Sequence, residues 1–209
     1  MITMHLGSEE VIQERPFTHP AYSAIDSRQI CYMLMRLSQI VNSINTSNNP
    51  NLFAPESHEL FESDGRHHRI IPIRPKLLVS ATSLCIVGFF GQRNLCSDSE
   101  SVASRDKMLF SEMQKHEGLL SYSSLELTNG DYGNCVIFLD ELAKNNWGYS
   151  QIHAEAVNDL SPLYYKSVRL YNGLVAGNVY DFYRMRLTTA KYFDYSASPV
   201  WFASRQISA

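Results

Sequence analysis

His153 is the side chain in this sequence best suited to acid–base chemistry. It lies in segment 147–160, where apolar residues recur at helical spacing, so the segment predicts a helix that turns the imidazole towards a core. The apolar residues of this stripe are Tyr149, Ala156, Val157 and Leu160. An imidazole titrates near neutral pH and can also bind a metal or haem iron. Three interpretations stay open: a general base, an axial ligand, and a core histidine hydrogen-bonded to a backbone or tyrosine partner.

Two further candidates for catalysis, Tyr122 and Glu126, lie on one face of a strand predicted over 119–127. If that face meets the predicted helix, both side chains join His153 in one cleft. If it faces away, they lie at a subunit interface. The sequence permits both arrangements, so His153, Tyr122 and Glu126 are together the predicted catalytic residues.

Arg93 and three aromatic residues are the candidates for ligand binding. Arg93 follows a strand end with two glycines, and a guanidinium can hold a carboxylate through two hydrogen bonds. Trp147, Tyr164 and Tyr165 can line an aromatic pocket, although aromatic residues at such spacing also form ordinary cores. The competing interpretations of Arg93 are a solvated strand end and an ion pair with an acidic residue.

Composition and motifs exclude several other kinds of site. The four cysteines, Cys31, Cys85, Cys96 and Cys135, show no CxxC or CxH spacing, so we expect free thiols and no metal site. The motifs of serine hydrolases, P-loop proteins, dinucleotide-binding proteins and zinc proteases are absent. The basic run 66–69 (RHHR) is either a small anion site or solvated surface.

Charge and hydropathy limit the partners. The net charge of −3, from 18 basic and 21 acidic residues, makes nucleic acid an unexpected partner. The longest strongly apolar run, Leu84 to Phe90, is too short to cross a bilayer, and the first ten residues lack the apolar core of a secretory signal. We therefore expect no membrane partner and a cytoplasmic protein.

The elements that must position these residues fall into three regions. Residues 1–75 are rich in proline and predict an extension with one amphipathic helix at about 27–44, capped by Asp26. Residues 76–195 predict the main domain, and residues 196–209 a short tail. The helix in the extension has an apolar stripe that must dock on the main domain or on a second subunit.

The main domain predicts an α+β fold of the ferredoxin-like type. Strands are predicted over 77–90, 119–127, 132–137 and 178–192, with helices from about residue 101, over 147–160 and over 161–171. The order β-α-β-β-α-β is that of the split βαβ unit. Asn129-Gly130 predicts a two-residue hairpin turn, which would pair Leu125 with Asn134. Both hairpin faces are then apolar, which predicts a homodimer that stacks sheet on sheet.

Segment 134–165 resembles the antibiotic-biosynthesis-monooxygenase-like family of dimeric α+β barrels. The strand Val136 to Asp140 ends in an acidic residue, Trp147 and His153 follow on a helix, and 161–165 (SPLYY) supplies a short aromatic helix. The resemblance implies a homodimer with a pocket between the sheet and the helices of each subunit.

The function that the resemblance implies is a cofactor-independent monooxygenase or isomerase acting on a small apolar or aromatic molecule. A non-catalytic binding or structural module is one alternative. Haem binding with His153 as axial ligand is another, and otherwise no cofactor is expected.

Overall fold

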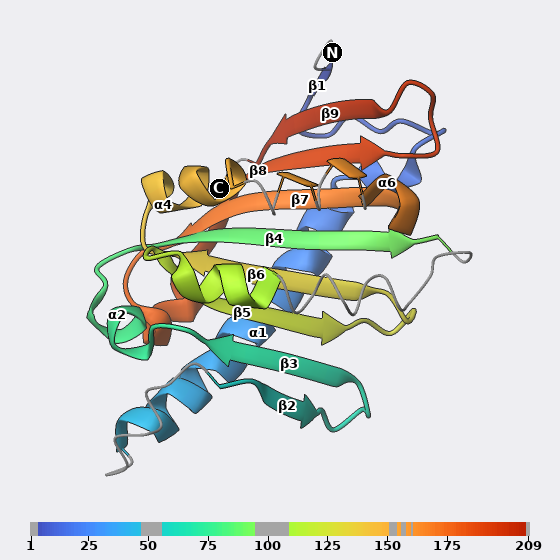
Figure 1. Ribbon diagram of the computed structural model, residues 1–209. Helices are drawn as coiled ribbons and strands as arrows, with labels where there is room; N and C mark the ends of the chain where they lie inside the picture. The colour runs from blue at the N-terminus through green and yellow to red at the C-terminus, as the bar shows by residue number, and fades with distance from the viewer. Residues whose placement is uncertain are drawn as a thin grey trace.

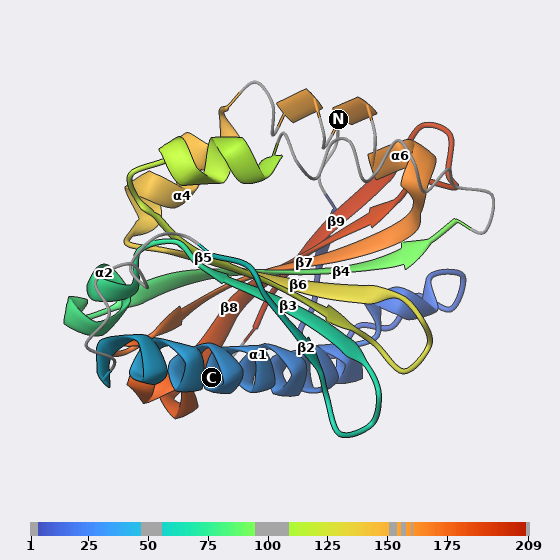
Figure 2. The ribbon, with the colours of Figure 1, turned by 60° about the horizontal axis from the view of Figure 1, so that its bottom comes forward.

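The computed structural model describes residues 4–46, 56–94, 109–150, 154–155, 158–159 and 161–207. These residues form an α+β protein built on one nine-stranded sheet, with helices on both faces of the sheet (Figures 1 and 2). The predicted α+β class is confirmed. None of the helices in the described ranges combines the length and the apolar character that crossing a bilayer requires.

The sheet has the strand order β1-β9-β8-β7-β4-β6-β5-β3-β2. All neighbouring strands are antiparallel except β1 and β9, which are parallel. The strands are β1 (Met4–Leu6), β2 (His58–Phe61), β3 (His67–Pro72), β4 (Leu84–Arg93), β5 (Leu119–Glu126), β6 (Tyr132–Phe138), β7 (Tyr165–Val175), β8 (Met185–Asp194) and β9 (Trp201–Gln206).

Helices cover the two faces unequally. The long helix α1 lies along one face, while α4 and the helical residues 109–115 lie over the other (Figure 2). The helices are α1 (Ala21–Thr46), α2 (Pro75–Ser80), α4 (Glu141–Gly148) and α6 (Ser161–Tyr164), with 3-10 helices η1 (Pro16–Thr18) and η4 (Val179–Arg184). The two faces therefore differ in how completely they are buried.

Helix α1 docks on the sheet of its own chain, which is one of the two outcomes that its apolar stripe predicts. Ile30, Met33, Leu34, Leu37 and Val41 are fully buried against the sheet. Gly88 of β4 permits the close approach, because a Cβ at that position would collide with the side chain of Ile30. The face that the sequence assigns to a second subunit is covered by α1 instead.

A buried ion pair fixes α1 on the sheet. Arg169 of β7 donates from Nε and Nη2 to the two carboxylate oxygens of Asp26, at 2.6 and 3.0 Å, and Asp26 is only 2% exposed. The ring of Tyr22 lies 4.3 Å from the guanidinium. The prediction that Asp26 caps the helix is wrong: α1 begins at Ala21, and Asp26 lies inside it.

The β5–β6 hairpin contains the predicted Asn129-Gly130 but in a longer loop. Leu127 N donates to Asp131 O at 2.8 Å and Gly130 N to Leu127 O at 2.9 Å, and Gly130 has a φ of +81°. This is a type I turn closed by a left-handed glycine, so only Gly130 needs a positive φ. The predicted register is wrong by one residue, because Leu125 pairs with Gly133 rather than Asn134.

Three of the predicted element boundaries are also wrong. The helix predicted over 161–171 ends at Tyr164, and β7 continues to Val175. Its residues 172–173 (Asn-Gly) do not cap a helix but lie opposite a β-bulge of β8 at Thr188, where Gly173 approaches the backbone of Arg186 closely. The strand predicted over 77–90 starts only at Leu84, after α2, and the strand predicted from residue 178 starts at Met185, after η4.

The described residues 154–155 of the helix predicted over 147–160 are helical, but Trp147 belongs to the preceding helix, α4. Asp140 caps it by accepting a hydrogen bond from Ala143 N at 2.7 Å, so α4 starts at Glu141 and ends at Gly148. Trp147 therefore lies near the end of a helix and not near the start of one. Residues 151–153, 156–157 and 160 of the predicted helix, including His153, lie outside the described residues.

Strands from the predicted extension and tail lie in the same sheet as the predicted main domain. Strand β3 pairs with β5, β2 pairs with β3, and β1 pairs with β9 of the tail. The sheet is thus continuous across residue 75. The division of the chain into three parts stays a prediction. Residues 1–75 supply both edge strands of the sheet, β1 and β2.

Replacing Asp26 by Asn should lower the free energy of unfolding by about 3 kcal/mol, because it leaves the charge of Arg169 buried without a counterion. Urea unfolding followed by circular dichroism measures the loss. The matched control is Lys115→Gln, since Lys115 is 71% exposed and pairs with Glu112 at 3.6 Å. That change should cost less than about 0.5 kcal/mol. Equal losses for the two variants would contradict the anchoring role of Asp26.

Candidate functional site

The sheet face opposite α1 is only partly covered by the rest of the chain. On the α1 side the central strands are sealed: Ile86, Phe90, Ile137 and Tyr171 are at most 1% exposed. On the other side the central strands present several partly exposed side chains, of which six lie side by side near the middle. We call these residues the half-covered face: Val87, Phe89, Tyr122, Asn134, Val136 and Leu170. They are mostly apolar or aromatic, which suits contact with an apolar partner.

Strand register brings these six residues side by side. Phe89 of β4 lies between Asn134 of β6 and Leu170 of β7, and Val136 lies between Val87 and Tyr122. Directly paired residues of adjacent strands point to the same side of a sheet. The corrected hairpin register is what places Tyr122 beside Val136 on this face.

A hydrogen-bonded pair is the polar feature of the half-covered face. The hydroxyl of Tyr122 donates to Asn134 Oδ1 at 3.2 Å. The guanidinium of Arg69, from β3, lies 5.5 Å from the centre of the Tyr122 ring. The side-chain nitrogen of Asn134 has no hydrogen bond to another described residue, so it remains a donor at the middle of an apolar surface.

Three of the predicted ligand-binding residues meet at the end of β4. Arg93 is the residue paired with Tyr165 at a bulge, and the rings of Tyr164 and Tyr165 contact each other edge to face at 4.8 Å. Tyr165 also packs on Phe89, with ring centres 5.1 Å apart. Its ring lies over Gly91, where a Cβ would overlap it. Glycine at position 91 is therefore required for Tyr165 to lie on the sheet.

The guanidinium of Arg93 binds residues of the β5–β6 turn. Its Nη2 donates to the carbonyl of Gly130, and its Nε lies 3.7 Å from Asp131 Oδ1. Burial alone would lower the pKa of Arg93, but its hydrogen bond with Tyr164 and the charges around it, Asp131 included, raise the pKa instead. Burial also raises the pKa of Tyr165. The geometry gives Arg93 a structural role at this turn.

The other predicted site residues lie elsewhere. Trp147 is 6% exposed and packs on His116, with ring centres 5.8 Å apart, in the core between α4 and the sheet. Glu126 ends β5 and accepts a hydrogen bond from His67 N at 3.1 Å. His153 lies outside the described residues. The structure therefore brings together Arg93, Tyr164 and Tyr165 and separates them from Trp147.

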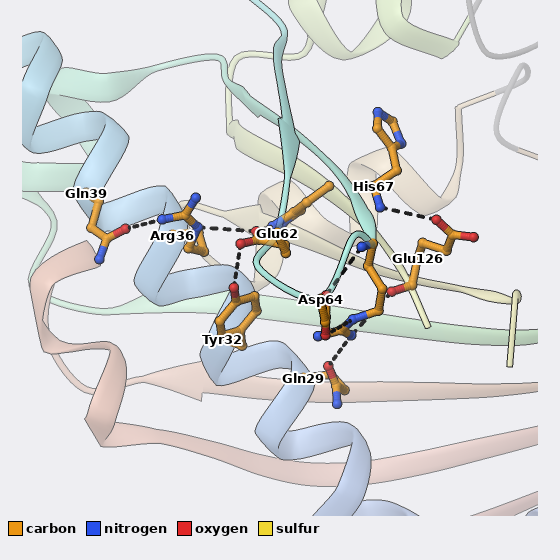
Figure 3. A network of polar contacts seen from close by, with 10 residues as sticks. Gln29, Tyr32, Arg36, Gln39, Glu62, Asp64, His67 and Glu126 are labelled. Atoms are coloured by element: carbon orange, nitrogen blue, oxygen red, sulfur yellow. Dashed lines mark hydrogen bonds and ion pairs between the residues drawn. The ribbon is translucent and has the colours of Figure 1, made fainter. Parts of the chain in front are cut away.

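A second group of polar residues, which the sequence did not suggest, surrounds Glu62 (Figure 3). Tyr32 and Arg36 of α1 donate to its two carboxylate oxygens, at 2.5 and 3.2 Å. His68 Nδ1 lies 2.7 Å from Glu62 Oε1. Burial alone would raise the pKa of Glu62, but the hydrogen bonds from Tyr32 and His68 and the charge of Arg36 hold it below its ordinary value.

His68 is completely buried in this group. Burial lowers its pKa, against the opposing effect of Glu62, so the ring is neutral at pH 7. A carboxylate can only accept, so Nδ1 carries the proton and donates it to Glu62. The other nitrogen, Nε2, is buried and has no hydrogen-bond partner in the described part of the chain. The Glu62–His68 pair has the carboxylate–imidazole hydrogen bond of many general bases, but it is buried away from solvent.

A solvent-open pocket of about 430 Å³ lies between the β2–β3 and β5–β6 turns. Arg66 spans this region: its Nε donates to Asp64 at 2.7 Å, and its Nη1 to Gln29 Oε1 at 3.4 Å and Glu126 O at 3.3 Å (Figure 3). The lining residues are Asp64, Gly65, Arg66, Glu126, Leu127, Thr128 and Gly130. Two carboxylates and one guanidinium line the same opening.

The basic run 66–69 does not form one anion site. Alternation along β3 sends His68 towards α1, while Arg69 faces Tyr122 and His67 pairs with Glu59 at 2.7 Å. Arg66 precedes the strand and holds the turn. The alternation of side chains along a strand separates these residues. The sequence predicts no strand over residues 58–72, so it does not reveal this separation.

No group of three or more potential metal ligands occurs among the residues that the structure describes. The described cysteines Cys31, Cys85 and Cys135 are free thiols. Burial raises the pKa of Cys135 to about 12, which makes its thiolate scarce at neutral pH. Cys96 lies outside the described residues.

The fold and these sites define an α+β protein with a single nine-stranded sheet and a half-covered face. No protein-family model matches the sequence, and no curated protein matches it.

Solved structures show only distant similarity. The protein SO0527 from Shewanella oneidensis is 13% identical, over 46% of this chain and 95% of that chain, with a TM-score of 0.37. An aldoxime dehydratase is 9% identical over 71% of this chain, with a TM-score of 0.26. A complex of aldoxime dehydratase with butyraldoxime is 11% identical over 71% of this chain, with a TM-score of 0.26. This chain covers 37% and 36% of those two chains. All three scores are too low to support an inference.

Replacing Gly91 by Ala should lower the free energy of unfolding by about 1–3 kcal/mol, because the new methyl group displaces the Tyr165 ring from the sheet. Urea unfolding measures the loss, and near-ultraviolet circular dichroism reports the tyrosine displacement. The control is Gly148→Ala in α4, where a Cβ meets no atom within 4 Å. Its expected effect is neutral or a gain of up to about 1 kcal/mol. If Gly91→Ala behaves like Gly148→Ala, Tyr165 does not rest on Gly91.

Proposed function

We propose that this protein binds a small apolar or aromatic molecule on the half-covered face. The observation that carries the proposal is the unequal burial of the central strands. Residues of β4 and β6 on the α1 side are sealed, whereas Val87, Phe89 and Val136 on the other side remain partly exposed. Partly exposed apolar groups beside a few polar groups are typical of ligand sites in proteins.

The Tyr122–Asn134 pair would orient a ligand in the proposed site. Because Tyr122 donates to Asn134 Oδ1, the amide nitrogen of Asn134 can donate to a ligand carbonyl or hydroxyl. Phe89 and Leu170 flank Asn134 on both neighbouring strands and offer the apolar contact. A flat aromatic molecule with one acceptor group satisfies both features.

The finer structural class is also part of the proposal. From β4 onwards the strands β4, β5, β6 and β7 stand in the spatial order β7-β4-β6-β5 with antiparallel neighbours, which supports a ferredoxin-like unit of the dimeric α+β-barrel kind. The homodimer stays a prediction. Since α1 covers one sheet face, a second subunit would have to use another surface.

The catalytic and haem-binding functions predicted from the sequence both require His153. A cofactor-independent monooxygenase or isomerase would need this imidazole as base beside the half-covered face, and haem binding would need it as axial ligand. Both remain predictions. Haem titration of the wild type and His153→Ala separates haem ligation from the other two functions, catalysis and simple binding, because only haem ligation by His153 gives a Soret band that the substitution alters.

The binding proposal predicts that 2-acetonaphthone, an aromatic ketone, and 2-ethylnaphthalene, its hydrocarbon counterpart, both bind. Replacing Asn134 by Leu should weaken binding of the ketone about tenfold, the effect of one lost hydrogen bond, and leave the hydrocarbon unaffected. Ligand-observed NMR titration gives both dissociation constants.

The control for this experiment is Ser123→Ala. Ser123 belongs to the same strand as Tyr122 but is buried on the α1 side, at 2% exposure. Its substitution should leave the affinity for both probes unchanged. The proposal fails if neither probe binds, or if Ser123→Ala weakens the ketone as much as Asn134→Leu does.

A further inference from the structure

Glu62 joins α1 to the hairpin of β2 and β3 through side chains from separate parts of the chain. Tyr32 and Arg36 come from α1, His68 comes from β3, and all three contact the carboxylate of Glu62, which directly follows β2. The rings of Tyr32 and His68 are stacked, with centres 6.2 Å apart. We call these four residues the clasp.

The clasp is built for a neutral His68. Its Nδ1 proton goes to Glu62, and its Nε2 is enclosed with no acceptor among the described residues. A second proton on the ring would place an N–H at Nε2 with nothing to receive it. Such a buried, unsatisfied charged donor is costly, so protonation requires the ring to leave its position.

The charges around His68 do not remove this cost. Glu62 favours a charged ring, but Arg36 on α1 and His67 on β3 oppose it, and burial opposes it most. The residues that β2 and β5 place opposite His68 are Leu60 and Leu125, which carry no charge. Tyr32 covers the ring from the α1 side as a neutral hydroxyl, and burial raises its pKa.

The same hairpin holds the pocket between the two turns. Between Glu62 and His68 lie Arg66, which donates to Glu126 O, and His67, whose amide donates to the Glu126 carboxylate. The turn closes through Glu62 N to Arg66 O and Gly65 N to Glu62 O, at 2.9 and 2.8 Å. Both residues that hold Glu126 therefore lie in the short segment between two members of the clasp.

We propose that the clasp is an acid-sensitive latch: protonation of His68 releases the β2–β3 hairpin from α1 and dismantles the pocket beside Glu126. The direction follows from linkage. Because the closed hairpin holds the pKa of His68 below its ordinary 6.5, an opened hairpin binds the proton first as pH falls. Glu62, whose pKa is also lowered, adds an effect of the same sign below about pH 4.5.

The test is amide hydrogen exchange of the full chain at several pH values, corrected for intrinsic rates. If the ring stays neutral in the closed hairpin, protection of the His67 amide, which donates to the Glu126 carboxylate, should fall about tenfold from pH 7.5 to pH 5.5, which follows from an opened-state pKa near 6.5. Protection of Ile86 in the β4–β7 ladder should stay constant.

Two variants separate the latch from general acid sensitivity. His68→Asn keeps a donor for Glu62 but cannot titrate, so the tenfold change should disappear. His67→Asn removes the exposed neighbouring histidine and should retain it. The same loss in His68→Asn, or its absence in the wild type, overturns the proposal.

Imidazole NMR of the wild type provides a measurement that needs no substitution. In the closed hairpin the His68 ring should remain the neutral tautomer protonated at Nδ1 down to pH 5.5. A ring that titrates near pH 6.5 while the His67 amide stays protected would overturn the latch even if His68→Asn fails to fold.

Discussion

The packing of α1 on the sheet is the contact on which the rest of the structure depends. A wide sheet has two apolar faces, and the buried residues of α1 seal one of them from within the same chain. Two local features make this contact close: Gly88 admits Ile30, and Asp26 pairs with Arg169. With one face sealed, the covering of the other face decides what the protein can bind.

The two polar groups of the structure lie on opposite sides of this division. On the half-covered face, Tyr122 and Asn134 place a hydrogen-bond donor among apolar side chains, which suits a ligand. On the α1 side, Glu62 and His68 are buried and closed, which suits a structural contact that responds to protonation.

Local sequence patterns predicted the α+β class, the stripe of α1 and the strand β5 well. They failed where a single residue or a distant partner decides. The β5–β6 loop gains a residue because only Gly130 takes a positive φ, and residues 165–171 form a strand and not the predicted helix because they pair with β4 and β8. The contacts of Glu62 with Tyr32 and Arg36 of α1 join residues 30 and 26 positions apart, so no spacing rule reveals them.

The central claim is that α1 seals one face and leaves the other to bind a ligand. Mapping of NMR chemical shifts during a titration with 2-acetonaphthone tests it most directly. The account predicts shifts at Phe89, Tyr122, Asn134 and Leu170 and none at Ile86 or Ile137 on the sealed face. Shifts centred on α1, or on the sealed face, would contradict it.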